Sequence, residues 1–236
     1  MERDDTPAGR LLDRREALAL RGAALLGRVL DAGAQERSAC VVRPQQMEGP
    51  FFVDTGLDRS DIRTDPATGE TSPGLPLQLT FRLSRFAAGG CVPLPAAHIE
   101  LWQCNAAGVY SGVSDGNARA AAQKFLRGYQ VTDAAGSAQF TTIYPGWYPG
   151  RAVHVHFLIR TGNSPARRDQ FTSQLYFDDL FTDKVHALPP YAGRGLRPVK
   201  NAGDGLYREG GSQLLLGVRQ QGTGLAATFD VSLQNA

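Results

Sequence analysis

Apolar and polar residues alternate in several runs along the chain from Leu77 onwards. The run 77–86 reads LQLTFRLSRF, with an apolar residue at nearly every second position. Successive side chains of a strand point to opposite faces, so this period predicts strands with one buried face. By the same criterion we expect further strands at 97–104, 125–132, 137–144, 152–159, 171–177 and 225–233. Turn-forming AAGG and DAAG segments separate the runs, and the series predicts an all-β fold, an antiparallel β-sandwich.

Other regions of the chain lack this alternation. Residues 41–76 are dense in Pro, Gly, Asp and Thr, which predicts an ordered arm of loops and short pieces. Residues 178–212 are expected to form a long irregular excursion. Near the start, an Ala- and Leu-rich stretch predicts an amphipathic helix from about residue 10 to 31. We therefore divide the chain into an N-terminal segment, 1–39, and a sandwich domain, 40–236.

The N-terminal segment has a second interpretation. Arg14-Arg15 precede an apolar stretch, as in a twin-arginine export signal, although Arg21 and Arg28 interrupt that stretch. The alternative is a helix that packs on the domain or on a second subunit. A cytoplasmic location and export both stay open at this point.

Composition narrows the class of protein. Of the 236 residues, 42% are hydrophobic and 20% are charged, as in a soluble domain, and the net charge is only +2. No Lys/Arg run suggests nucleic-acid binding, and no apolar stretch is long enough to span a membrane. We expect a small-molecule substrate. The odd number of cysteines allows at most one internal disulfide, and pairing of Cys40 with Cys91 stays open.

The sharpest chemical signal is the histidine pair in RAVHVH, residues 151–156. On a strand, His154 and His156 project from the same face, while Val155 points to the other. Such a pair is a frequent metal half-site, but it is equally compatible with two polar residues on a solvent-facing strand. Other ligands must complete a metal shell.

Tyrosine is the candidate for these other ligands. No Cys, Asp or Glu lies close to the histidines in sequence, whereas the preceding turn contains Tyr144 and Tyr148. A phenol has an unperturbed pKa of about 10, so it ligates as tyrosinate only beside a strongly charged, hard cation. Ferric iron meets this requirement, whereas zinc or copper would more usually recruit a carboxylate, a thiolate or a third imidazole.

Several blocks in order resemble the intradiol ring-cleavage dioxygenases, the family that cleaves catechol, hydroxyquinol and protocatechuate. The resemblance covers roughly residues 40 to 177. The blocks are EGPFF at 48–52, LDRSDI at 57–62, IELWQCNAAGVYSG at 99–112, FLRGYQVTDAAG at 125–136, FTTIYPGWYPGRAVHVHF at 140–157 and TSQLYF at 172–177. The compact PGWYPGR turn further resembles the shorter, often exported branch of this family.

The resemblance implies a transthyretin-like core and a set of site residues. It implies Fe(III) as the cofactor, with Tyr110, Tyr148, His154 and His156 as the metal ligands. Arg151 and Gln174 match active-site residues, and Tyr148 is also expected to accept a proton from the substrate. The implied reaction uses O2 to open a catechol ring between its two hydroxyl-bearing carbons, which gives a cis,cis-muconate-type diacid.

Alternatives stay open beside this reading. One is a transthyretin-like binding module that has lost catalysis, since fold alone does not fix function. Another is a copper or zinc protein that uses the histidine pair, in which the tyrosines would have no role. Tyr144 competes with Tyr148 for the second tyrosine position. Neither the identity of the catechol nor assembly as a homo-oligomer is decided by the sequence.

Overall fold

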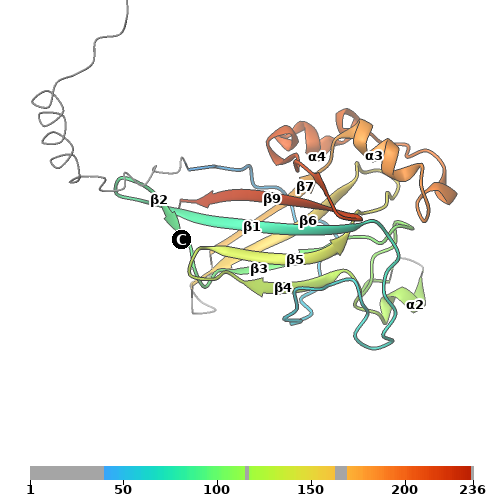
Figure 1. The fold of residues 1–236 in the computed structure, drawn as a ribbon, viewed down its shortest axis with the longest axis horizontal. Coiled ribbons are helices and arrows are strands. Elements are labelled where there is room, and N and C mark those ends of the chain that lie inside the picture. Colours follow the sequence, from blue (N-terminus) through green and yellow to red (C-terminus); the bar gives the residue numbers. More distant parts are fainter. Residues whose placement is uncertain (1–39, 115–116, 163–168, 235–236) are drawn as a thin grey trace, which may run out of the picture. The chain divides into compact units, whose positions relative to one another are not determined.

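Two β-sheets form the body of the chain in the computed structural model, which describes residues 40–114, 117–162 and 169–234 (Figure 1). The sandwich predicted from the alternation is confirmed. The expected N-terminal helix and export signal lie outside the described residues.

The first sheet is built around the long strand β1, Pro76–Ala87. Its other members are β2 (Gly90–Pro93), β5 (Ser137–Ile143), β8 (Arg219–Gln221) and β9 (Gly224–Leu233). Along one side β1 pairs antiparallel with β5 and β2, and along the other it pairs with β9 in parallel. That parallel pair departs from the antiparallel prediction. The chain returns to β1 only after building the whole second sheet, so no tight turn fixes the direction of β9.

The second sheet is antiparallel throughout and has the strand order β4-β3-β6-β7. Its strands are β3 (His98–Trp102), β4 (Arg127–Val131), β6 (His154–Thr161) and β7 (Asp169–Tyr176). In its register, His156 lies between Trp102 of β3 and Gln174 of β7. Sequence blocks far apart in the chain therefore meet around this one histidine.

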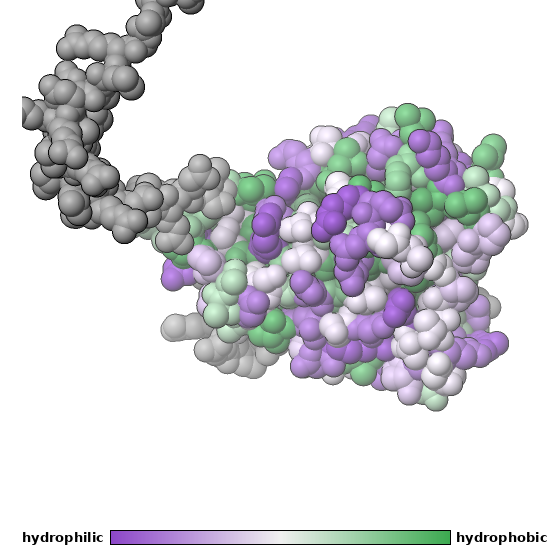
Figure 2. Space-filling model, viewed as in Figure 1, coloured by the Kyte–Doolittle hydropathy of each residue, from purple (hydrophilic) through white to green (hydrophobic). Residues whose placement is uncertain are grey.

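The core lies between the sheets. On β1 the residues Leu77, Leu79, Phe81 and Leu83 are buried, as the alternation predicts. The Phe81 ring lies 5.2 Å from that of Phe157 on β6, which joins the two layers. Each such side chain contributes roughly 1.5–3 kcal/mol by leaving water. Figure 2 shows mostly hydrophilic residues over the middle of the outward face of the first sheet, opposite the core.

The predicted irregular excursion is wrong in detail, because residues 178–214 form a series of short helices at one end of the sandwich (Figure 1). They are α3 (Asp179–His186), η3 (Ala192–Arg194), η4 (Asn201–Gly203), α4 (Gly205–Arg208) and η5 (Gly211–Leu214). A further short helix, α2 (Ala118–Ala121), lies elsewhere. Helices this short show too few turns for a helical period to be visible in the sequence.

The expected arm is ordered and packs on both sheets. A Cys40–Cys91 disulfide fastens its start to β2. Further on, the Gln46 amide donates to the Thr172 carbonyl at 2.8 Å, and the Ile62 amide donates to the Thr141 carbonyl at 3.0 Å. Within the described residues, no helix is both long and apolar enough to cross a membrane.

Candidate metal centre and active site

His154 and His156 face each other at the start of β6, on the side of the strand opposite Val155 and Phe157. Their Nε2 atoms are 2.9 Å apart. The Nδ1 of His154 lies 2.7 Å from the Ala152 carbonyl, which can only accept, so this nitrogen carries the proton and Nε2 is left with its lone pair. A neutral imidazole held in this way is ready to ligate a metal through Nε2.

Burial keeps both histidines neutral. Burial, followed by the nearby Arg151 cation, lowers the pKa of His154 to about 3. Burial, followed by His154, holds the pKa of His156 well below its usual range. The Trp102 ring stacks on His156 at 4.9 Å with an interplanar angle of 4°, and fixes the imidazole plane.

Two tyrosines reach the histidines from separate loops. Tyr110, from the loop after β3, is 1% exposed. Tyr148, from the turn before β6, places its hydroxyl 3.1 Å from Nε2 of His154. The two phenol rings are 5.5 Å apart. The structure thus brings together the four residues that the sequence singled out as metal ligands.

The phenols resist ionisation in the absence of a cation. Burial raises the pKa of Tyr148 to about 12, and burial together with Tyr148 raises the pKa of Tyr110 well above its usual range. The Tyr110 hydroxyl is buried beside that of Tyr148, and no hydrogen bond of normal geometry satisfies it among the described residues. An unpaired buried polar group costs about 1–3 kcal/mol, so this arrangement needs a further partner.

A hard cation such as ferric iron fits this donor set. It would accept the lone pairs of both imidazoles and lower the pKa values of the two phenols, so that they bind as tyrosinates. Within the described part of the chain, no group of three His, Cys, Asp or Glu residues is placed to hold a metal. The oxygen donors that lie beside the histidine pair are those of Tyr148 and Tyr110.

The loops that carry the tyrosines touch at Gly108. Its φ is +74°, and a Cβ at this position would lie 2.1 Å from the carbonyl oxygen of Trp147. Only glycine allows this close approach. The backbone two residues before Tyr110 is thereby held against the backbone one residue before Tyr148.

The arm closes the site from outside. The Phe51 ring stacks on Tyr110 at 4.3 Å and contacts Tyr148 edge-on at 5.5 Å. Phe52 packs on Trp102 at 5.0 Å. His154 and His156 are therefore buried, although they lie on the face of the second sheet that points away from the core.

Arg151 and Gln174 form a connected polar group beside the ligands. The Nη2 of Arg151 donates to the Oε1 of Gln174 at 2.5 Å, and Nε donates to Asp204 at 2.8 Å. Sequence reasoning missed Asp204, which also caps α4 by accepting from the amides of Leu206 and Tyr207. An aspartate before Gly-Leu-Tyr is a helix-capping signal, but nothing local in the sequence links it to Arg151.

Tyr144 does not belong to the cluster. Its hydroxyl pairs with Thr182 Oγ1 at 2.7 Å, and its ring packs on Phe177 at 4.4 Å. The structure places Tyr148, rather than Tyr144, beside the histidines.

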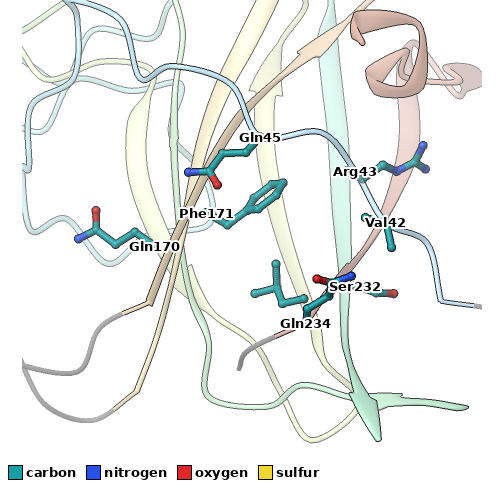
Figure 3. Close-up of a pocket in the computed structure, with 8 residues that line it drawn as sticks. Val42, Arg43, Gln45, Gln170, Phe171, Ser232 and Gln234 are labelled. Atoms are coloured by element: carbon teal, nitrogen blue, oxygen red, sulfur yellow. The ribbon is translucent and has the colours of Figure 1, made fainter. Parts of the chain in front are cut away.

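A pocket of about 540 Å³ opens onto Tyr148 and Arg151. Its lining comes from the arm, from the turn before β6 and from the segment around α4. The lining residues are Met47, Gly49, Pro50, Phe51, Tyr148, Pro149, Arg151, Asp204, Gly205, Leu206 and Glu209. Another pocket, of about 360 Å³, lies between the arm and the ends of β7 and β9 (Figure 3). None of the predicted site residues lines that second pocket, whereas Tyr148 and Arg151 line the first, which is therefore the candidate substrate pocket.

Comparison with known proteins agrees with this geometry. A family model described as "Dioxygenase" matches residues 47–189, more than half of the chain. A catechol 1,2-dioxygenase from Acinetobacter baylyi is 31% identical over 159 residues, which are 63% of this chain but only 47% of that protein. The chain therefore spans about half the length of this relative.

Solved structures extend the likeness over most of the described chain. An intradiol ring-cleavage dioxygenase from Tetranychus urticae is 28% identical and superposes with a TM-score of 0.70, covering 83% of this chain and 96% of that one. The dioxygenase domain of a dioxygenase carbohydrate-binding protein fusion from Streptomyces sp. SirexAA-E is 31% identical, with a TM-score of 0.57 over 83% of this chain and 99% of that one. The chain belongs to the family of intradiol ring-cleavage dioxygenases.

Proposed function

We propose that this protein is a non-haem Fe(III) dioxygenase that opens a catechol-type ring between its two hydroxyl-bearing carbons. One carbon–carbon bond breaks, both atoms of O2 enter the product, and a cis,cis-muconate-type diacid results. The observation that carries the proposal is the buried meeting point of Tyr110, Tyr148, His154 and His156 beside a substrate-sized pocket. Ferric iron would supply a Lewis-acid centre that holds both catechol oxygens and makes the ring reactive towards O2.

Tyr148 is suited to take up a substrate proton. It is half-buried and lines the pocket, whereas Tyr110 is buried and enclosed under Phe51. Burial raises the pKa of the Tyr148 phenol, so its phenolate would be basic enough to accept a proton from a catechol hydroxyl.

Arg151 and Gln174 lie beside the proposed ligands and would act on the reacting oxygens. The Arg151 guanidinium is always protonated, and its contacts to Asp204 and Gln174 fix its position before the substrate arrives. A preorganised cation stabilises charge that develops during the reaction without rearranging. The Gln174 amide is held from its other side by the Met47 carbonyl, which its Nε2 contacts at 3.2 Å.

The deciding measurement combines the visible spectrum of the iron-loaded protein with product analysis. We expect a broad charge-transfer band from tyrosinate bound to Fe(III), a shift of that band on anaerobic addition of catechol, and a muconate-type product in air whose mass is that of catechol plus O2. Tyr110→Phe and Tyr148→Phe should each weaken the band, and Tyr144→Phe is the matched control that should keep it.

If the protein stays colourless after loading with ferric or ferrous iron in air, no tyrosinate binds Fe(III), and the proposed metal site is contradicted. Catechol binding without ring opening would instead leave the fold as a binding module.

We also propose that the protein is exported. The Arg14-Arg15 segment supports this, and so does the Cys40–Cys91 disulfide, because such bonds persist mainly in oxidising compartments. Replacement of both arginines by lysine should retain the protein in the cytoplasm, as measured by fractionation. Equal export of the wild type and the variant would contradict the use of a twin-arginine signal.

A further inference from the structure

The charges that line the substrate pocket bear on which catechol it accepts. Three charged side chains line it: Arg151, Asp204 and Glu209. Arg151 donates to the Asp204 carboxylate at 2.8 Å, and the Asp204 side chain is 0% exposed. These two charges neutralise each other, and Nη2 of Arg151 is also engaged by Gln174. Apart from this paired guanidinium, no cationic side chain of the described residues lines the pocket, so an incoming carboxylate would meet no unpaired cation there.

Glu209 is the charge that stays uncompensated. It follows α4 at the mouth of the pocket and is exposed. Among the described residues, no Lys, Arg or His forms an ion pair with it. Its neighbour Arg208 contacts the Ala202 carbonyl instead, at 3.5 Å, and does not line the pocket. The net charge of the lining is thus negative, and its source is a single side chain.

The rest of the wall is largely apolar and roomy. It is formed by Met47, Pro50, Phe51, Pro149 and Leu206. Pockets of several hundred Å³ accommodate drug-sized ligands, so a bare catechol ring would fill only part of this one. The pocket extends from Tyr148 and Arg151 to the end of α4, where Glu209 is found.

We infer that this site takes a catechol whose ring carries an apolar substituent with a neutral or cationic end, and that Glu209 discriminates against an anionic end. This inference rests on the proposed function and gives it a substrate class. A substrate carboxylate would be desolvated against the apolar wall, close to a like charge and without a free cation. An ammonium group at the same place would be attracted.

A matched series of substrates tests this inference. Three catechols share a two-carbon arm at ring position 4 and differ only in the terminal group: 4-(2-aminoethyl)catechol, 4-propylcatechol and 3-(3,4-dihydroxyphenyl)propanoate. We expect kcat/KM to be highest for the ammonium or methyl compound and roughly threefold to tenfold lower for the carboxylate, a range typical of partly exposed charge pairs. The difference should shrink with added NaCl.

Variants assign the effect to Glu209. Glu209→Gln should reduce the ammonium-to-carboxylate ratio of kcat/KM roughly threefold to tenfold, and Glu209→Lys should reverse the order of the two. Glu70→Gln is the matched control: it removes the same charge from a distant pair with Arg119, and the ratio should keep its wild-type value. A ratio unchanged in Glu209→Gln, or a carboxylate preferred by the wild type, would overturn the inference.

Direct binding separates this inference from the proposed function. Calorimetric Kd values for the same three compounds, measured without O2 on the iron-loaded protein, report the charge preference even if no ring opens. Absence of cleavage for the whole series would defeat the proposed function, whereas the order of the Kd values would still decide the role of Glu209.

Discussion

Gly108 is the residue at which the loop that carries Tyr110 contacts the turn that carries Tyr148. Its positive φ and its contact with the Trp147 carbonyl both exclude a side chain. We predict that Gly108→Ala lowers the free energy of unfolding by at least about 2 kcal/mol, from backbone strain and overpacking together. It should also weaken the visible band of the iron-loaded protein, because both tyrosine loops shift. Denaturant unfolding and absorbance measure the two effects.

The control for this variant isolates backbone strain. Gly222 has a φ of +56° in the turn between β8 and β9, with nothing within 4 Å of an added Cβ. Gly222→Ala should cost about 1 kcal/mol and leave the band intact. Equal effects of the two substitutions would show that the Trp147 contact is unimportant.

Glu100 makes stability depend on pH near neutrality. Its carboxylate pairs with Arg160 at 2.9 Å on the buried side of the arm. Burial, followed by the nearby Asp54, raises the pKa of Glu100 from 4.5 to about 7. Between these two values the folded state holds a proton that the unfolded state has lost, so the free energy of unfolding falls as pH rises. Glu100→Gln should remove this fall, which amounts to at most about 3 kcal/mol.

Urea unfolding of the wild type and of Glu100→Gln at pH 5 and pH 8 measures how the free energy of unfolding of each protein changes with pH. Asp61→Asn is the control, because the hydrogen bond from Arg63 lowers the pKa of Asp61 and places its titration below this window. If the difference between wild type and Glu100→Gln does not change with pH, Glu100 has no raised pKa.

At the scale of elements, α4 links the helical segment to the site through one carboxylate. Asp204 accepts from the amides of Leu206 and Tyr207 with one oxygen, and from Arg151 and the Ala152 amide with the other. We predict that Asp204→Ala lowers stability by about 2–4 kcal/mol, since a cap is lost and a partly buried guanidinium loses its partner. kcat/KM for catechol should fall by one to two orders of magnitude as Arg151 loosens.

Asp178→Ala is the matched control for Asp204→Ala, because it also removes a helix cap. Asp178 caps α3 by accepting from the Phe181 amide at 2.8 Å, and it does not line the substrate pocket. Its removal should cost about 1 kcal/mol with kcat/KM retained. If the two alanine variants lost the same activity, α4 would matter only for stability.

At the scale of the whole molecule, the disulfide holds the arm that closes the site. It joins residues separated by 51 positions, and a loop of this length is expected to contribute about 2–4 kcal/mol. We predict that dithiothreitol lowers the unfolding free energy of the wild type by this amount. Substrate KM should rise as well, because Phe51 and the pocket wall lie on the same arm. Cys40→Ser should show the lower stability from the start and no response to the reductant.

The sequence by itself determined what depends on neighbouring residues. Period-two alternation located β1, β5, β6 and β9 to within a few residues, because burying one face of a strand imposes that pattern directly. The alternation missed β2 and β8, because strands this short bury too few side chains to produce a visible pattern. The same parity placed His154 and His156 on one face. Nearness to the histidines in sequence pointed to Tyr144 and Tyr148, whereas Tyr110 entered only through resemblance to a family, since its loop carries no pattern of its own.

The tertiary structure decided what depends on contacts between distant segments. The parallel pairing of β1 with β9, the packing of Phe51 on Tyr110 and the contact of Asp204 with Arg151 each join parts of the chain that no local period relates. Tyr144 and Tyr148 are chemically alike and four residues apart in the printed sequence, yet only Tyr148 reaches the histidines. The direction in which the turn points each side chain is set by packing, because a loop lacks the repeating geometry that lets a strand be interpreted from sequence.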